Sequence, residues 1–304
     1  MSCPIFIKNF KVRSLDLDFN EISWEIETFS SAKADIFDYT FQILRSESPE
    51  GPFDQVSPTF QDRYLFIDTS IKTGSTFRHY YYRIRTTTLA TGLFEDTDSV
   101  TLEPDADLIA TELRKHMNLL FREFVGRRCW VMPVRTFGQR CGCWNDTLQK
   151  RTRSGCRTCY DTGFIRGYLS PIEAWIMFDP SANTRQQTNI GELEQDNTTA
   201  KLGFYPELKP RDVIIEPENR RWRIQQVNQT EQLRAPVHQE VSMHLIPRSD
   251  VEYSIVLDMD TALKDLWLSP ARNFTNPQNL SNFEDEEIPG IYGLYPTTYA
   301  PVRT

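Results

Sequence analysis

The chain has 304 residues, enough for two or three domains, and 39% of them are apolar, so it can form packed cores. Aromatic residues make up 12% of the chain and only 13 residues are glycine, which favours sheets with buried aromatic side chains over glycine-rich nucleotide-binding folds. The net charge is −8, so the whole molecule is not a general nucleic-acid binder. The sequence also lacks the glycine-rich phosphate-binding motifs, the serine-hydrolase motif GxSxG and the zinc-protease motif HExxH. We therefore expect a protein that is not an enzyme.

No stretch of the sequence approaches the roughly 18 consecutive apolar residues of a membrane-spanning helix. The first residues, MSCPIFIKNFKVRS, lack the apolar run of a signal peptide. We therefore expect a soluble protein that is made in the cytoplasm and has no membrane partner.

The first hundred residues contain five short segments with the apolar pattern of half-buried strands. These segments are residues 22–26, 39–43, 64–67, 80–84 and 99–102. Stretches rich in turn-forming residues, such as SESPEGPF at 46–53, separate them. Short strands divided by turns predict an antiparallel β-sandwich rather than a parallel sheet.

This region resembles fibronectin type III domains in the segments ISWEIE, YTFQILRSESPEGPF and FIDTSIKTGSTFRHYYYRIRTTT, which correspond to strands B, C and E–F of that family. Trp24 stands where the family buries a tryptophan, and Tyr80 with Tyr82-Arg83-Ile84 is similar to its strand-F signature. The resemblance implies a fibronectin III-like β-sandwich over residues 1–103, a module that usually provides contacts or spacing.

Between residues 104 and 126 the apolar residues recur at steps of three and four, which predicts an amphipathic helix. The apolar stripe consists of Leu108, Ile109, Leu113, Met117, Leu120, Phe121, Phe124 and Val125. Asp105 or Asp107 can cap the first turn, and Gly126 can end the helix in a left-handed conformation. We expect the helix to pack on its own domain; the alternative is docking on a neighbouring subunit.

Four cysteines form two close pairs separated by twelve residues, Cys141 and Cys143, then Cys156 and Cys159. Two such pairs of thiolates can surround a tetrahedral zinc ion. The second pair resembles the zinc knuckles of DnaJ-type chaperones, C-x-x-C-x-G-x-G, with Asp161 in place of the first glycine. Because the first pair is C-x-C and no J-domain is visible, the resemblance does not imply chaperone activity.

The cysteine spacing also allows other chemistry. Disulfides are one alternative, but closely paired cysteines in a cytoplasmic chain more often bind metal. A redox-active C-x-x-C is another, but no thioredoxin-like βαβ pattern surrounds it. We therefore expect a structural zinc ion in a knuckle segment, residues 127–166, and no catalytic zinc, because four protein ligands leave no position for water. Cys3 and Cys129 are expected to be ordinary thiols.

The charge around the cysteines is strongly positive. Residues 127–168 include nine basic and two acidic side chains, a net charge of +7 in a chain whose net charge is −8. These cations can offset the negative charge of a four-thiolate zinc centre, or they can face DNA or an acidic partner surface. The candidates for such contacts are Arg127, Arg128, Arg140, Lys150, Arg151, Arg153 and Arg157.

Strand-like patterning returns after residue 167. The predicted strands are residues 172–178, 212–216, 221–227, 237–246 and 253–257, and the polar residues 181–203 predict a long exposed loop or hairpin. Strands joined by tight turns in this order suit a small antiparallel β-barrel over residues 167–257.

Part of this barrel resembles head-closure and head–tail joining proteins of tailed bacteriophages, in the segment LKPRDVIIEPENRRWRIQQVNQTEQLRAPVHQEVSMHLI. Both contain a proline, an acidic residue, a β-branched pair, a turn and then a strand with an aromatic residue. The remaining residues, 258–304, combine spaced prolines and aromatics, which predicts either a disordered tail or an extended C-terminal arm along adjacent subunits. We expect the arm.

The whole order of sandwich, helix, knuckle, barrel and arm resembles a virion neck component. This resemblance implies a mainly β, multidomain structural protein of a tailed bacteriophage, placed in the virion between portal and tail and built as a homo-oligomeric ring. Its expected partners are other neck, portal or tail proteins, with a passing contact to the genomic DNA. One alternative is a zinc-stabilised nucleic-acid-binding protein that uses the basic residues of 127–166, and another is an adhesion or carbohydrate-binding module of a phage fibre or collar.

Overall fold

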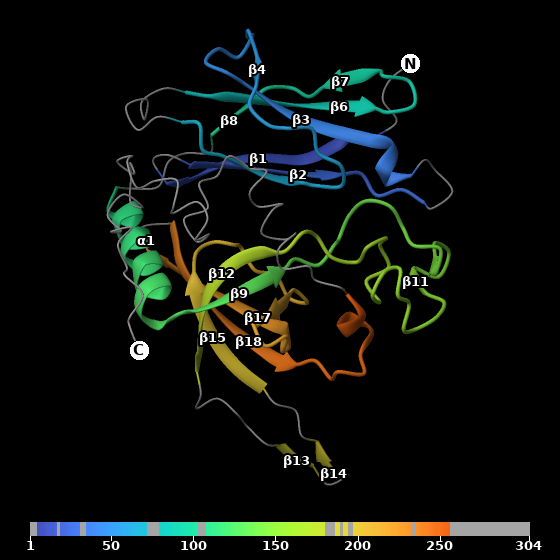
Figure 1. Cartoon of the computed structure of the whole chain (residues 1–304), viewed down its shortest axis with the longest axis vertical. Coiled ribbons are helices and arrows are strands. Elements are labelled where there is room, and N and C mark those ends of the chain that lie inside the picture. The colour runs from blue at the N-terminus through green and yellow to red at the C-terminus, as the bar shows by residue number, and fades with distance from the viewer. Residues whose placement is uncertain are drawn as a thin grey trace, which may run out of the picture. The chain divides into compact units, whose positions relative to one another are not determined.

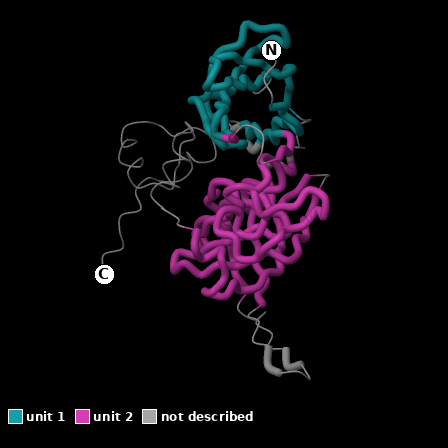
Figure 2. The backbone as a smooth tube through the Cα atoms, turned by 90° about the vertical axis from the view of Figure 1, so that its right-hand side faces the viewer, with its two compact units in different colours: residues 1–26, 37–105, 263–304 teal, residues 27–36, 106–262 magenta. Residues whose placement is uncertain are grey.

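The computed structural model of the protein (Figure 1) describes residues 5–16, 19–30, 35–71, 79–102, 108–179, 186–188, 191–193, 197–232 and 235–255. Within these residues the protein is mainly β with one α-helix, as predicted. The chain divides into two compact units, which Figure 2 distinguishes by colour. Unit 1 contains the described residues up to 102 other than those of 27–36; unit 2 contains the described residues of 27–36 and of 108–255. No helix in these parts of the chain is long and apolar enough to cross a membrane.

Unit 1 is a β-sandwich of two antiparallel sheets, as predicted. The first sheet consists of β1 (Ile7–Asp16), β2 (Phe19–Ile26) and β5 (Leu65–Asp68), in that spatial order. The second consists of β4 (Asp54–Gln55), β3 (Tyr39–Ser46), β6 (Tyr81–Thr88) and β7 (Phe94–Asp96), and β8 (Val100–Thr101) also pairs with β6. The five segments predicted as strands overlap β2, β3, β5, β6 and β8, and β1, β4 and β7 are additional strands.

The inner faces of the two sheets share an aromatic core with a polar network inside it. Trp24 of β2 packs against Phe41 of β3, with ring centroids 6.1 Å apart. The hydroxyl of Tyr82 donates to Asp68 Oδ2 at 2.9 Å and accepts from Asn20 Nδ2 at 3.0 Å. Because these hydrogen bonds join β6 to β5 and β2, they tie the two sheets together, and the predicted inward position of Trp24 and Tyr82 is confirmed.

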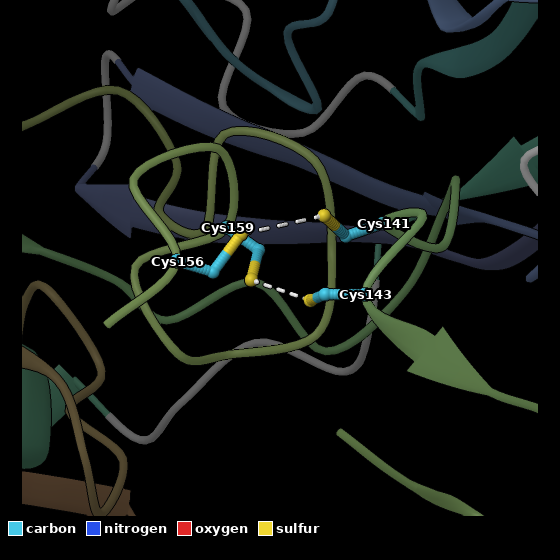
Figure 3. A group of neighbouring side chains, drawn as sticks. All are labelled: Cys141, Cys143, Cys156 and Cys159. Carbon is cyan, nitrogen blue, oxygen red and sulfur yellow. Dashed lines mark hydrogen bonds between the residues drawn. The ribbon is translucent and has the colours of Figure 1, made fainter. Parts of the chain in front are cut away.

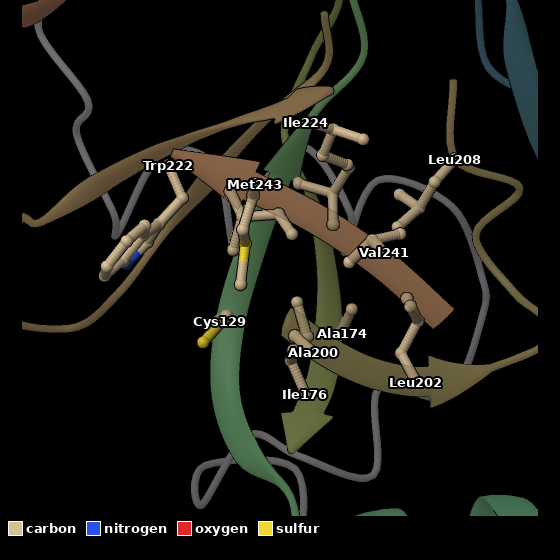
Figure 4. Packing of buried hydrophobic residues seen from close by; sticks show 12 residues of the cluster. Cys129, Ala174, Ile176, Ala200, Leu202, Leu208, Trp222, Ile224, Val241 and Met243 are labelled. Carbon is tan, nitrogen blue, oxygen red and sulfur yellow. The ribbon is translucent and has the colours of Figure 1, made fainter. Parts of the chain in front are cut away.

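Unit 2 is built on a closed barrel of six antiparallel strands. In spatial order they are β12 (Ile172–Asp179), β15 (Asn197–Gly203), β18 (Ala235–Leu245), β17 (Arg221–Gln232), β16 (Val213–Ile215) and β9 (Arg127–Met132). The barrel closes because β9 pairs with β16 on one side and with β12 on the other. Alternate residues of each strand point inward and form one apolar core, which Figure 4 shows. Its buried members are Cys129, Val131, Ala174, Ile176, Ala200, Leu202, Leu208, Ile214, Trp222, Ile224, Val241 and Met243.

The predicted strands of this region are confirmed with two exceptions. Residues 253–255, the described part of the predicted strand 253–257, do not form a strand: Val251–Ser254 is a 3₁₀ helix (η5), closed by hydrogen bonds from Tyr253 N to Asp250 O and from Ile255 N to Glu252 O. The polar stretch 181–203 is not only a loop, because it ends in barrel strand β15. Before β15, the strands β13 (Gln186–Thr188) and β14 (Gly191–Leu193) form the hairpin that was the other prediction.

The helix α1 (Leu108–Leu120) continues as a π-helical turn (Phe121–Val125) and packs on β15 and β18. Its predicted apolar stripe forms only part of the packing face: Phe121 of the stripe is buried, but Ile109 is 61% exposed and Phe124 is 76% exposed. The packing face carries Ala110 and Phe121, together with Arg114, whose guanidinium lies 4.6 Å from the Phe204 ring centroid. The barrel thus contacts a mixed face of the helix and leaves part of the apolar stripe exposed.

Gly126 ends the helix, but the predicted left-handed conformation is wrong, because its φ is −86°. The glycine is required for a different reason: a Cβ at this position would lie 2.1 Å from the carbonyl oxygen of Phe121. The predicted caps Asp105 and Asp107, and the predicted arm of residues 258–304, lie outside the described residues.

Candidate metal centre

The four paired cysteines lie in the long connection between β9 and β12. Within this connection β10 (Trp144–Asn145) pairs with β11 (Lys150–Arg151), so a short hairpin separates the first cysteine pair from the second. A backbone bond from Cys141 N to Gly163 O (3.0 Å) joins the first pair to the turn that follows the second. Sequence positions up to 22 residues apart are thereby brought to one place.

The four thiols converge on one point, as Figure 3 shows. All four sulfurs lie within 4.8 Å of one another, with 3.9 Å between Cys141 and Cys156 and 3.4 Å between Cys143 and Cys159. These separations are too long for disulfide bonds, and the four cysteines are free thiols. Four sulfurs placed at ~2.3 Å from one ion in a tetrahedron would be about 3.8 Å apart. The cluster therefore has the dimensions of a site for a single metal ion.

The cluster is closed to solvent and takes the place of an apolar core. The four cysteines are between 0 and 4% exposed, and Ile165 is the one partly buried apolar side chain that packs against them within the described residues. A segment with so little apolar surface to bury gains little from the hydrophobic effect, so a bound ion can supply the cross-links that its packing lacks.

Asp161 braces the second cysteine pair. Its carboxylate accepts hydrogen bonds from Gly155 N (3.0 Å) and Cys156 N (3.2 Å) and forms an ion pair with Arg151 at 2.9 Å. With φ of 61°, Asp161 lies in the left-handed region that favours glycine and tolerates aspartate. This geometry explains why an aspartate can stand where the zinc knuckles that the segment resembles have a glycine.

Two further contacts position the first pair. Thr152 donates to the carbonyl of Cys143 from both its backbone nitrogen (2.8 Å) and its hydroxyl (3.0 Å). Upstream, Phe29 pairs with the strand segment before Cys141: Phe29 N donates to Gly138 O (3.2 Å) and Arg140 N donates to Phe29 O (2.9 Å). The sequence carried no signal for the second contact, because its partners are more than a hundred residues apart.

The thiols of the cluster differ in acidity. Burial and hydrogen bonds with the neighbouring thiols raise the pKa of Cys143. Burial also acts to raise the pKa of Cys156, but backbone N–H groups of Thr158 and Cys159 and the guanidinium of Arg153 donate to its sulfur and lower its pKa to about 6. The lowered pKa favours the thiolate form of Cys156 at neutral pH, whereas Cys143 would have to lose its proton to bind a metal ion.

Five of the seven basic side chains predicted as contacts have intramolecular partners, and three of these five lie outside the loop between the cysteine pairs. Arg127 forms ion pairs with Glu216 (2.6 Å) and Glu218, and Arg128 forms one with Glu173. The guanidinium of Arg140 lies 4.1 Å from the ring centroids of both Trp144 and Phe164, and burial lowers its pKa. Lys150, Arg151 and Arg153 are exposed on the loop between the two cysteine pairs, and Arg157 is exposed within the second pair. Of these four, Arg151 pairs with Asp161 and Arg153 donates to the sulfur of Cys156.

A polar cavity of about 450 Å³ lies beside the cysteine segment, where that segment meets the barrel and η5. Arg151 and Tyr160 line it from the cysteine segment, and Arg223 and Glu252, which form an ion pair with each other, line it from the other side. Tyr168 also donates to Glu252 at 3.4 Å. Two of the cations in its wall are thus paired with carboxylates that also line it, Arg223 with Glu252 and Arg151 with Asp161.

No protein-family model and no curated protein matches this chain. The residues of the site themselves indicate its chemistry: four converging, buried thiols can hold a metal ion.

Proposed function

We propose that the four cysteines bind a structural zinc ion. Four thiolates at tetrahedral spacing form a closed Cys₄ site of the kind that zinc occupies in knuckles and ribbons. An iron–sulfur cluster also uses four cysteines, but it contains several iron atoms and needs its thiolates farther apart than the 3.4 to 3.9 Å found here. Because all four ligand positions belong to the protein, the ion would stabilise the loop rather than activate water.

Metal analysis tests this proposal. Purified protein should contain close to one zinc per chain, and Cys156→Ser should remove it. Cys129→Ala is the matched control, because Cys129 is also a buried free thiol but lies in the barrel core. Metal-free protein, or another metal bound with equal occupancy, would contradict the assignment of zinc.

We further propose that the protein is a structural component of a tailed-bacteriophage virion, at the neck between portal and tail. The observation that carries this proposal is the closed antiparallel barrel of β9, β12 and β15–β18, because it contains the segment whose sequence resembles head-closure proteins. A β-sandwich precedes the barrel in the chain, and a loop braced by a metal ion connects two of the barrel strands. Both features suit a scaffold that holds other proteins. The role is non-enzymatic, the partners are other neck, portal or tail proteins, and the protein acts in the virion after its synthesis in the host cytoplasm.

The exposed part of helix α1 supports an assembly role. Four exposed apolar side chains lie in α1 and in the π-helical turn that continues it: Ile109, Leu120, Phe124 and Val125. Exposed apolar side chains grouped on one helical stretch suit an interaction surface, and an interface between subunits would bury them. Subunits that meet through two different surfaces form a ring when the rotation closes, which is the assembly expected at a neck.

Two measurements test the assembly role. Sedimentation velocity over a concentration series should show a closed oligomer, and the double variant Ile109→Ser/Phe124→Ser should shift it toward the monomer. Leu148→Ser is the control, because Leu148 is an exposed apolar residue of the same unit outside the helix. Gold-labelled antibodies on purified virions should mark the neck. Labelling of fibres or collar would favour the adhesion alternative, and a monomer absent from virions would contradict the proposal.

A further inference from the structure

The loop between the two cysteine pairs presents a cluster of positive charge. Lys150, Arg151, Arg153 and Arg157 are all exposed and lie within eight residues of one another. The flanking acidic residues in the chain are Asp146 and Asp161, and the latter is already paired with Arg151. We call residues 149–158 the basic loop.

Two of these cations are held in place and two are without partners. Arg151 is fixed by its ion pair with Asp161 (2.9 Å), and Arg153 by a hydrogen bond to the sulfur of Cys156 (3.7 Å). Lys150 and Arg157 form no ion pair or side-chain hydrogen bond with any residue that the structure describes. The loop therefore offers a partly ordered set of cations, which loses less entropy on binding an anion than four free side chains would lose.

The basic loop also contains an open depression of about 290 Å³. Its walls are formed by Lys150, Arg151, Thr152, Arg153 and Ser154. Every one of these side chains can donate a hydrogen bond and none of them is a carboxylate. Such a lining suits an oxyanion with several acceptor oxygens, and phosphate is the commonest oxyanion of this kind on a macromolecule.

The composition of the basic loop favours nucleic acid over an acidic protein. Protein interfaces bury an apolar centre, but residues 149–158 carry no exposed apolar side chain. Interfaces with nucleic acid are polar and positively charged. The aromatic residues that flank the basic loop in the chain, Trp144 and Tyr160, are both half-buried, and the guanidinium of Arg140 lies over the Trp144 ring. The basic loop itself contains no aromatic side chain on which a base could stack. Contacts would therefore go to the backbone and carry no sequence preference.

We infer that the basic loop is a binding surface for the phosphate backbone of nucleic acid. Because the rest of the chain is acidic, the protein approaches a polyanion through this loop and binds it weakly, in the range of non-specific complexes. The surface depends on the cysteine cluster, since Thr152 is bound to the carbonyl of Cys143 and Arg153 to the sulfur of Cys156. This inference adds a ligand to the protein and does not depend on its place in a virion.

Binding of a short labelled DNA duplex to the full-length, metal-loaded protein tests the inference. Fluorescence anisotropy between about 50 and about 200 mM salt should give an affinity that falls with salt, with a slope that reports about one released counterion for each phosphate contact. The double variant Lys150→Gln/Arg157→Gln should bind several-fold more weakly and lower the slope by about two. Zinc content and circular dichroism of the variant should equal those of the wild type, because both side chains are exposed and neither forms a hydrogen bond with a cysteine of the cluster.

The matched control is Lys209→Gln/Arg248→Gln, which removes the same charge from exposed positions of unit 2 outside the basic loop. This control should retain the affinity and slope of the wild type. An equal loss in the control, or no DNA binding at about 50 mM salt, would overturn the inference. So would an acidic peptide that competes as well as unlabelled DNA of equal charge, because the surface would then fit a protein partner. Any of these failures would leave the barrel and its assembly role untouched.

Discussion

At the scale of single residues, the candidate metal site depends on a side chain outside the four cysteines. Asp161 accepts two backbone N–H groups at the second cysteine pair and is tied to β11 through Arg151. Removing a group that orients metal ligands typically lowers the affinity for the metal by about 10- to 100-fold. We expect Asp161→Ala to weaken zinc binding by about this factor, measured by competition with a chelating dye. Asp146→Ala, an exposed acidic residue of the same loop, should have little effect, and equal losses in both variants would show that only the loop's charge matters.

A second residue gives the barrel a pH dependence. Burial raises the pKa of Asp212 to about 6, although the backbone N–H groups of Val134 and Lys209 donate to its carboxylate and oppose the shift. The pKa of an aspartate in the unfolded chain is about 4. Between about pH 4 and about pH 6, the folded state therefore keeps a proton on Asp212 that the unfolded state has lost. The contribution of Asp212 to stability is therefore greatest near pH 4 and falls as the pH rises through 6, by an amount on the order of 3 kcal/mol.

This dependence can be isolated by comparison with Asp212→Asn, which cannot titrate. The difference in the free energy of unfolding between the wild type and the variant, from urea titrations, should shrink as the pH rises from about 4 to about 7. Protonation of the metal ligands affects both proteins and cancels in the difference. A difference that stays constant with pH would contradict the raised pKa.

The sequence indicates the four cysteines of the candidate metal site, but it does not indicate which carboxylates pair with Arg127 and Arg128. The two cysteine pairs are recognisable because their spacing is local, and the structure brings all four thiols together. Arg127 and Arg128 read as part of a basic surface, yet their carboxylate partners Glu216 and Glu173 lie 89 and 45 residues away in the chain. Only the closure of the barrel brings such distant charges into contact.

At the scale of elements, helix α1 shows how far periodicity can predict packing. The step of three and four residues correctly predicts a helix, but the same pattern does not show which face the barrel covers. That choice depends on distant residues: Arg114 stacks on Phe204 and donates to Pro236 O (2.8 Å). The sequence pattern did not predict strand β15. Its inward residues Thr198 and Ala200 are small or polar, so the strand shows little alternation of apolar and polar side chains.

The two phenylalanines of the π-helical turn test this assignment of faces. Phe121 is buried and Phe124 is the most exposed apolar residue of the helical segment. We expect Phe121→Ala to lower the free energy of unfolding by about 3 kcal/mol or more, because it leaves a cavity. Phe124→Ala should change it by no more than about 0.5 kcal/mol in the monomer. The measurement is urea unfolding at low protein concentration, and similar losses in both variants would mean that the exposed stripe is covered within the chain.

At the scale of the whole molecule, the candidate metal site belongs to one of two units with different cores. Unit 1 is stabilised by an aromatic core with a buried network around Asp68 and Tyr82, whereas unit 2 combines a barrel core with the cysteine cluster. Strand patterns predict both β-units, because each buries alternate residues of its strands. The membership of β9 in the barrel is not predictable in this way, because the whole cysteine segment separates β9 from β12 in the chain.

Chelation of the metal should therefore affect one unit alone. After treatment with a strong zinc chelator, hydrogen exchange should become faster by orders of magnitude in the amides of residues 137–168, because the four thiols would lose the ion that cross-links them. Amides of β3 and β6 should exchange at an unchanged rate, since their hydrogen bonds and core lie in unit 1. Cys156→Ser is the control: its residues 137–168 should exchange fast from the start and should not respond to the chelator. If chelation instead accelerated exchange equally in both units, the chain would unfold as one cooperative body, and the role of the ion would extend beyond the segment that holds it.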